Sequence, residues 1–134
     1  MIFNNQYQMV GSGSSGGCAL TSILVSYSLQ KPISQDLAMT GQISKDGKVG
    51  AVSGIYLKID AAIEKRLKKV IIPLDNKIDF EALPSRIKDS IIVHFAETFQ
   101  DIYNIAFLKC QWNQNFLLDY EICSKRINKI ALLL

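Results

Sequence analysis

Apolar positions along the chain fall into runs whose spacing predicts alternating helices and strands. The run 18–29 is apolar almost all round, interrupted by one threonine and three serines, which predicts a helix buried on most of its circumference. Two extended segments follow, 37–43 and 48–52, and the Asp46-Gly47 pair between them is a hairpin signal. The first part of the chain is therefore expected to form a buried helix and a β-hairpin.

The middle of the chain continues this alternation. A helical face is predicted from apolar residues three and four apart, with Ser53-Gly54 as its start, namely Ile55, Ile59, Ala62, Ile63 and Leu67. Two β-branched runs, 70–73 and 91–95, predict strands that each follow a helical or turn segment. Thr98 and Asp101 form a capping-box pattern that opens a helix through Ala106. Together these elements predict a single α/β domain.

A further amphipathic helix is predicted at the C-terminus. Its apolar seam repeats at intervals of 4, 3, 4, 3 and 4 residues and consists of Phe116, Tyr120, Cys123, Ile127, Ile130 and Leu134. We expect residues 1–108 to form the domain and residues 109–134 to form a helical extension that packs on it or on a partner.

Composition narrows the class of protein. The 134 residues are 49% hydrophobic and 20% charged, which suits one globular domain and excludes a disordered chain. The net charge of +3 is small and scattered, so no nucleic-acid partner is expected. Neither an N-terminal leader nor an apolar run of about 18 residues is evident, so we expect no membrane partner and a cytoplasmic location.

Three familiar kinds of site are disfavoured by the residues available. Three widely spaced cysteines and one histidine predict neither a disulfide framework nor a metal site. The segment 11–18 has the glycine spacing of a phosphate loop, but Gly17-Cys18 replaces its lysine and hydroxyl residue, so no nucleotide cofactor is expected. A hydrolase that uses His94 stays a rival hypothesis, although a structural role suits a histidine in an apolar strand better.

The remaining candidate chemistry is a serine in a glycine-rich turn and a lysine beside an apolar helical face. Burial disfavours the charged form of a lysine, and a neutral amine accepts a proton from a serine hydroxyl. Gly16 and Gly17 would let a substrate carbonyl approach backbone N–H groups at the helix start. Simpler roles also fit such residues, because a serine suits a helix cap and a lysine suits a solvated side chain whose stem covers apolar surface.

An ordered series of segments resembles the proteolytic domain of the Lon protease family over roughly residues 11–106. The most specific are Ala-Met-Thr-Gly ending at Gly41 and Lys-Val-Ile-Ile-Pro ending at Pro73. The resemblance implies that Ser15 is the nucleophile and that Lys58, 43 positions on (58 minus 15), is the general base. It also places Thr40 where a hydroxyl supports that lysine. Choosing Ser14 instead would shift every later match by one residue.

The same resemblance implies a serine peptidase with a Ser-Lys dyad that cleaves unfolded or flexible polypeptides without a metal or a nucleotide in this chain. Family members assemble as rings, so a homo-oligomer and an ATPase partner acting in trans are further expectations. The chain departs from the family at Ser12, Gln42 and Ser53. Only 14 residues precede Ser15, so we expect this chain to be without part of the sheet that comes before the nucleophile in the family, and without the ATPase module. The alternative hypothesis is an inactive Lon-like remnant that acts as an interaction or assembly module.

Overall fold

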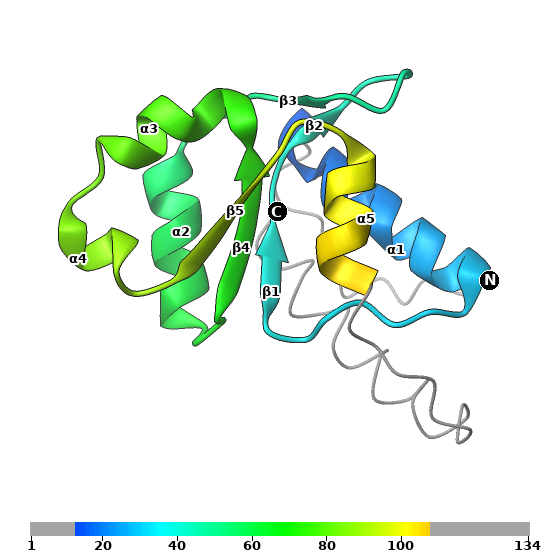
Figure 1. Ribbon diagram of the computed structural model, residues 1–134, viewed down its shortest axis with the longest axis horizontal. Coiled ribbons are helices and arrows are strands. Elements are labelled where there is room, and N and C mark those ends of the chain that lie inside the picture. The colour runs from blue at the N-terminus through cyan, green and yellow to red at the C-terminus, as the bar shows by residue number, and fades with distance from the viewer. Residues whose placement is uncertain (1–12, 108–134) are drawn as a thin grey trace.

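A three-stranded parallel sheet forms the centre of the domain, and helices cover both of its faces (Figure 1). The computed structural model describes residues 13–107. The strand order is β1-β4-β5, so the fold is of the expected α/β class. In chain order the elements are η1 (Ser14–Gly16), α1 (Gly17–Leu29), β1 (Leu37–Met39), β2 (Gln42–Ile43), β3 (Val49–Gly50), α2 (Ile55–Glu64), β4 (Lys69–Pro73), η2 (Leu74–Asn76), α3 (Lys77–Glu81), α4 (Ser85–Lys88), β5 (Ile92–Ala96) and α5 (Phe99–Phe107).

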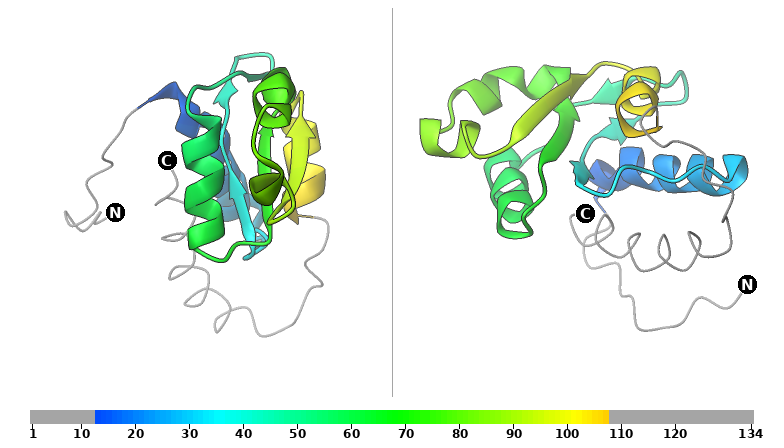
Figure 2. Two further views of the ribbon diagram at one scale, coloured as in Figure 1. Left: turned by 90° about the vertical axis from the view of Figure 1, so that its left-hand side faces the viewer. Right: turned by 60° about the horizontal axis from the view of Figure 1, so that its bottom comes forward.

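The sheet separates two apolar cores. On one face Ile71 packs with residues of α1 and α5, and on the other Val70 and Ile72 pack with α2 and α4. Figure 2 shows α2 and α5 on opposite sides of the sheet. Residues 70–73 of β4 are all buried because this central strand is covered on both faces, as is usual for parallel sheets. The predicted β-branched run therefore lies where its composition suits it.

The predicted strand 37–43 is in fact two strands in different sheets. β1 pairs in parallel with β4, whereas β2 pairs antiparallel with β3 in a separate two-stranded hairpin. The break falls at Thr40 and Gly41, where Gly41 has a φ of 155°. The expected turn over 44–47 is present, because the Gly47 N–H donates to the Ser44 carbonyl at 3.0 Å. A single strand over 37–43 was therefore wrong, while the hairpin turn was correct.

Helix α1 is less enclosed than its apolar sequence predicts. Cys18, Ala19 and Ser22 are buried against the core, but the opposite side is open. Leu20, Leu24 and Tyr27, spaced four and three residues apart, are 48%, 58% and 61% exposed. The expectation of a helix buried on most of its circumference was therefore wrong for the part of the chain that the structure describes. We call these three residues the α1 stripe.

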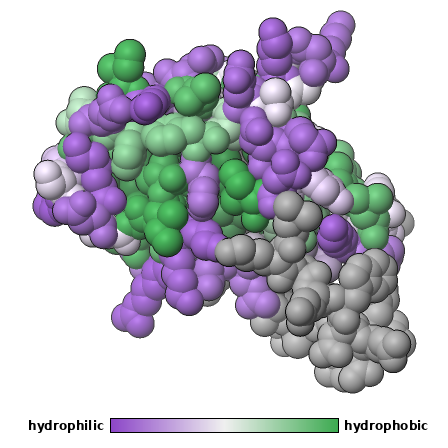
Figure 3. Space-filling model, in the orientation of Figure 1, coloured by the Kyte–Doolittle hydropathy of each residue, from purple (hydrophilic) through white to green (hydrophobic). Residues whose placement is uncertain are grey.

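The start of α5 follows the predicted capping pattern. The Asp101 carboxylate accepts hydrogen bonds from the Thr98 backbone N–H at 2.9 Å, from the Thr98 hydroxyl and from the Glu97 N–H. These bonds, led by the one from the Thr98 N–H, lower the pKa of Asp101. α5 covers only one end of β5, where Ala96 is buried, while Ile92 at the other end is 56% exposed. Apolar residues are accordingly visible on this side of the molecule (Figure 3).

Two expectations concern the ends of elements or of the chain. α2 ends at Glu64, earlier than the predicted apolar face, because Arg66 takes a positive φ of 57°, although Leu67 still packs in the same core. The predicted helix over 116–134 and the predicted boundary at 108–109 lie outside the described residues. Within residues 13–107, no helix has the length and apolar character needed to cross a membrane.

Candidate active site

Ser15 lies in a tight turn directly before α1. The Gly16 N–H donates to the Gly13 carbonyl at 3.3 Å, and the Gly17 N–H donates to the Ser14 carbonyl, which makes one turn of 3-10 helix. Ser15 is half-buried in this turn. Its side chain therefore sits at the N-terminal end of a 13-residue helix, where the helix dipole carries partial positive charge.

The segment Thr40-Gly41 ties Ser15 to the sheet. The Ser15 carbonyl oxygen accepts from the Gly41 N–H at 2.9 Å and from the Thr40 hydroxyl at 3.2 Å. The Thr40 N–H in turn donates to the Ile71 carbonyl of β4 at 3.0 Å. Thr40 is buried, as a supporting residue would be, but its hydroxyl holds the backbone of Ser15 rather than the lysine.

Two glycines allow this close contact between the turn and the strand. A Cβ at Gly41 would lie 2.8 Å from Cys18 Sγ and 2.9 Å from Val49 Cγ1, closer than real Cβ atoms come. A Cβ at Gly17 would lie 3.1 Å from the Ile43 backbone nitrogen. Gly17 was expected to make room for a substrate, and here it makes room for the β2 backbone. Gly41 was not among the predicted site residues, although it directly follows Thr40 in the sequence.

Lys58 reaches the same place from the other face of the sheet. It lies in the first turn of α2, and its Nζ lies 3.4 Å from Ser15 Oγ, within hydrogen-bond distance. Lys58 is half-buried. Among the ion pairs of residues 13–107, none involves Lys58. The structure thus brings together two predicted residues that are 43 positions apart in the sequence.

The amide groups expected to stabilise an oxyanion are already engaged. Gly16 and Gly17 donate to the carbonyls of the 3-10 turn, and the Cys18 N–H donates to the Gly41 carbonyl at 3.0 Å. In this conformation the N-terminal end of α1 therefore offers its dipole, rather than these N–H groups, to charge on the Ser15 oxygen.

The remaining predicted residues are placed elsewhere. His94 lies in β5, paired with Ile71, on the strand at the opposite edge of the sheet from β1. Gln42 begins β2, and Ser53 is exposed one residue before Gly54, whereas Ser12 lies outside the described residues. Among residues 13–107, no group of three or more His, Cys, Asp or Glu side chains could hold a metal ion.

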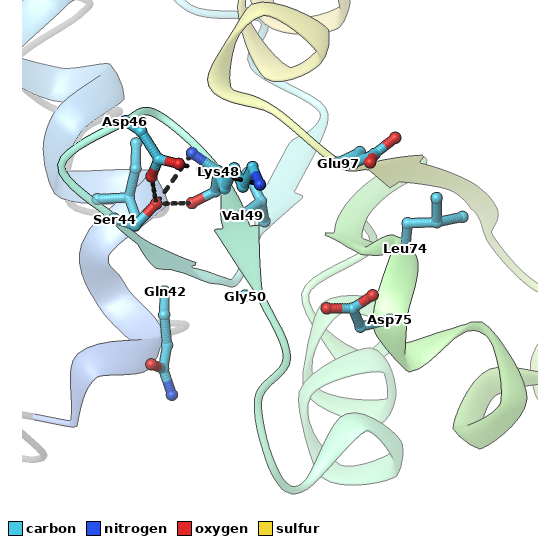
Figure 4. Close-up of a pocket in the computed structure, with 10 residues that line it drawn as sticks. Gln42, Ser44, Asp46, Lys48, Val49, Gly50, Leu74, Asp75 and Glu97 are labelled. Carbon is cyan, nitrogen blue, oxygen red and sulfur yellow. Dashed lines mark hydrogen bonds and ion pairs between the residues drawn. The ribbon is translucent and has the colours of Figure 1, made fainter.

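An open pocket of about 620 Å³ lies beside the hairpin, but neither Ser15 nor Lys58 lines it (Figure 4). The hairpin turn with Asp46 and Lys48 forms one wall, and Asp75 and Glu97 lie across from it. A hydrogen bond from the Ser44 hydroxyl lowers the pKa of Asp46, and Lys48 adds to the effect. Gln42, which lines this pocket, directly follows the segment Thr40-Gly41 that holds Ser15.

Cys18 is a free, fully buried thiol three residues after Ser15. Burial raises its pKa from 9.0 to about 11, because the thiolate would lose its hydration there. Its Sγ lies 3.7 Å from the Gln42 carbonyl oxygen, which accepts a weak hydrogen bond. Cys18 is thus a packing residue between α1 and the hairpin.

A parallel sheet covered by helices, with a serine directly before helix α1 and a lysine in reach of it, defines an α/β domain with a Ser-Lys pair. Residues 9–109 match the model of the Lon protease (S16) C-terminal proteolytic domain. The chain therefore belongs to the family of Lon proteolytic domains, as its motifs indicated.

Known Lon proteases are similar to the chain over most of its length. It is 48% identical over 95 residues, 71% of the chain, to the mitochondrial Lon protease homolog of Drosophila melanogaster, and covers 9% of that protein. It is 41% identical over 95 residues, again 71% of the chain, to the Bos taurus mitochondrial homolog and covers 10% of it. With the Lon protease of Fusobacterium nucleatum it shares 37% identity over 97 residues, which are 72% of the chain and 13% of that protein. The chain thus spans about a tenth of the length of these relatives.

Proposed function

We propose that the chain is a serine peptidase that hydrolyses peptide bonds through Ser15 and Lys58. The observation that supports this most directly is the 3.4 Å distance between Lys58 Nζ and Ser15 Oγ, in a chain of the Lon proteolytic family. A general base must lie within hydrogen-bond reach of the proton that it removes, directly or through one water. Free catalytic pairs often tighten when substrate binds, so this distance suits a resting dyad.

The chemistry follows from the two side chains. Neutral Lys58 accepts the Ser15 hydroxyl proton while Ser15 Oγ forms a bond to the peptide carbonyl carbon. The resulting ammonium then protonates the leaving nitrogen as the C–N bond breaks, which leaves an acyl group on Ser15. Water, deprotonated by Lys58, hydrolyses this ester and regenerates the serine. None of these steps consumes a nucleotide, so we propose that peptide cleavage by this chain is independent of ATP.

The substrate proposed is an unfolded or flexible polypeptide. Ser15 is only half-buried, and the hairpin pocket begins one residue beyond Gly41, so an extended chain passing over Ser15 would find room for its flanking residues. A folded protein presents such an extended segment when part of it unfolds. An ATPase that unfolds substrates in trans is therefore a suitable partner, as is a second copy of the chain.

Cleavage of an unstructured protein tests the proposal. The purified chain should convert a casein-like substrate to short peptides, and Ser15→Ala should lose at least about a thousandfold in rate while remaining folded. A serine-reactive fluorophosphonate should label the wild type at Ser15 and leave the variant unlabelled. Equal cleavage by Ser15→Ala and wild type would refute the assignment of the nucleophile.

The α1 stripe favours a second candidate function, namely an inactive assembly module. Three large side chains exposed on one helical face are typical of an interaction surface. If the chain neither cleaves substrate nor reacts with the fluorophosphonate, and is found associated with other copies in solution, this second candidate replaces the first.

A further inference from the structure

The position of the Lys58 amine depends on where α2 begins. Lys58 is the fourth residue of α2, and its backbone N–H makes a helical bond to the Gly54 carbonyl at 3.1 Å. The segment 51–54, which joins β3 to this helix, belongs to neither sheet, and Gly54 takes a positive φ of 72°. A shift of this segment would therefore move the base of the lysine side chain.

The buried side chain of Asn76 makes two hydrogen bonds to this segment. Asn76, 2% exposed, accepts from the Val52 N–H through Oδ1 at 2.9 Å and donates to the Val52 carbonyl through Nδ2 at 2.9 Å. In a sheet, a neighbouring strand would bond to the Val52 N–H and carbonyl, and here the Asn76 amide makes both bonds instead. Its Nδ2 also donates to Asp79 Oδ2 at 2.6 Å, which fixes the orientation of the amide, because the reversed amide would direct an oxygen at the carboxylate.

Asn76 also relates Lys58 to the strand that anchors Ser15. It ends η2, which directly follows β4, while the Thr40 N–H bonds to Ile71 in the middle of that strand. Ser15 is therefore tied to β4 through Thr40 and Gly41, and Lys58 is tied to it through Asn76 and Val52. Ser15 and Lys58 are thus both positioned relative to β4.

We infer that Asn76 is a positioning residue that sets the Lys58 amine against Ser15, with Asp79 fixing the orientation of its amide. This inference rests on the proposed function of the Ser-Lys pair. We call the two hydrogen bonds between Asn76 and Val52 the clamp. A misplacement of about 1 Å at a catalytic group lowers rates by up to about a hundredfold. Loss of the clamp is therefore sufficient to disable the dyad while Ser15 and Lys58 are both still present.

The experiment compares Asn76→Ala with Asp101→Ala, which removes the cap of α5 and whose hydrogen bonds go to Glu97 and Thr98 rather than to the segment 51–58. Both variants should melt below the wild type, and kinetics should be measured well below both melting points with a fluorogenic peptide. Asn76→Ala should lower kcat about 10- to 100-fold with KM changed less than about threefold, whereas Asp101→Ala should keep kcat. Unchanged kcat in Asn76→Ala would overturn the inference and leave the proposed function intact.

Backbone hydrogen exchange separates this inference from the proposed function. In Asn76→Ala the amides of residues 51–58 should exchange faster than in the wild type, and in Asp101→Ala they should not. Asp79→Ala should give a smaller increase in the same segment, because Asn76 keeps its bonds to Val52. Unchanged exchange over 51–58 in Asn76→Ala would refute the clamp even if wild-type cleavage fails, whereas failure of wild-type cleavage with faster exchange would refute only the catalytic assignment.

Discussion

Gly41 donates its backbone N–H to the carbonyl oxygen of Ser15 at 2.9 Å, and this bond places the turn that carries Ser15 beside the end of β1. The contact is close because Gly41 has no Cβ. Where a Cβ would lie, Cys18 Sγ and Val49 Cγ1 are already within 2.9 Å. The position of Ser15 thus depends on a residue 26 positions later (41 minus 15) that takes no part in the proposed chemistry.

Gly41→Ala should destabilise the domain by about 1–3 kcal/mol, since either the turn or the hairpin must move away. Urea unfolding measures this change. Gly50→Ala is the matched control, because a Cβ there would lie 3.7 Å from the Gln42 Cβ, an ordinary contact, and it should change stability by less than about 0.5 kcal/mol. Equal effects of the two substitutions would contradict the role given to Gly41.

Lys58→Arg should be as inactive as Lys58→Met, although it keeps the positive charge. An arginine side chain does not lose its proton in proteins, so it donates hydrogen bonds to Ser15 but accepts no proton from it. Peptidase assays of the two variants, with circular dichroism as the folding control, check this. Substantial activity in Lys58→Arg would show that the lysine acts as a charge rather than as a base.

Ser14→Ala should keep full activity and so distinguish the two adjacent serines. Ser14 is exposed, and its contribution to the 3-10 turn is its backbone carbonyl, which the substitution leaves in place. Cleavage rate and fluorophosphonate labelling should both match the wild type. A loss comparable with that of Ser15→Ala would move the nucleophile to Ser14.

Thr40→Val should lower the cleavage rate even at a temperature where the variant is fully folded. The variant removes the hydroxyl that donates to the Ser15 carbonyl at 3.2 Å, while the Gly41 N–H still donates there, so about 1 kcal/mol of stability should be lost. Thr40→Ser keeps the hydroxyl and should restore most of the rate. If both variants are equally active at a temperature where both are folded, the hydroxyl has no role in positioning Ser15.

Cys18 should make the domain less stable at alkaline pH. Its folded-state pKa of about 11 lies above the ordinary value of 9.0, so the unfolded chain loses this proton first as the pH rises. The buried, protonated thiol contributes on the order of 2 kcal/mol to the free energy of unfolding. This contribution is complete below about pH 9 and is lost as the pH rises toward 11. Urea unfolding of wild type and Cys18→Ala, measured at pH 8 and pH 10.5, should show a smaller pH dependence in the variant.

The sequence was sufficient to predict elements whose residues repeat with a clear period. The apolar face that starts at Ile55, the run ending at Pro73 and the cap formed by Asp101 all lie in the structure where their patterns placed them. The break at Gly41 was not predicted, because the residues from 37 to 43 are a continuous strand pattern. The side chains that crowd Gly41 belong to other elements, Cys18 to α1 and Val49 to β3. Local patterns do not contain such contacts.

The candidate site shows the same difference between what a local sequence pattern predicts and what depends on contacts between distant residues. Ser15 and Lys58 were identified through resemblance to a family, since neither a serine in a glycine-rich turn nor a lysine beside an apolar face is specific by itself. Their contact depends on two helices from opposite faces of a sheet, which no local period encodes. The bond from the Thr40 hydroxyl to Ser15 and the bonds between Asn76 and Val52 were not predictable either, because each joins a side chain to a backbone group at least 24 residues away.

The α1 stripe has a practical consequence for anyone who handles the protein. Helix α1 has no charged residue, and three of its apolar side chains are exposed to water, namely Leu20, Leu24 and Tyr27. Salts such as ammonium sulfate strengthen the tendency of such surfaces to leave water. The protein should therefore bind phenyl resin and precipitate early as sulfate is added, and a charged residue in place of Leu24 should delay both.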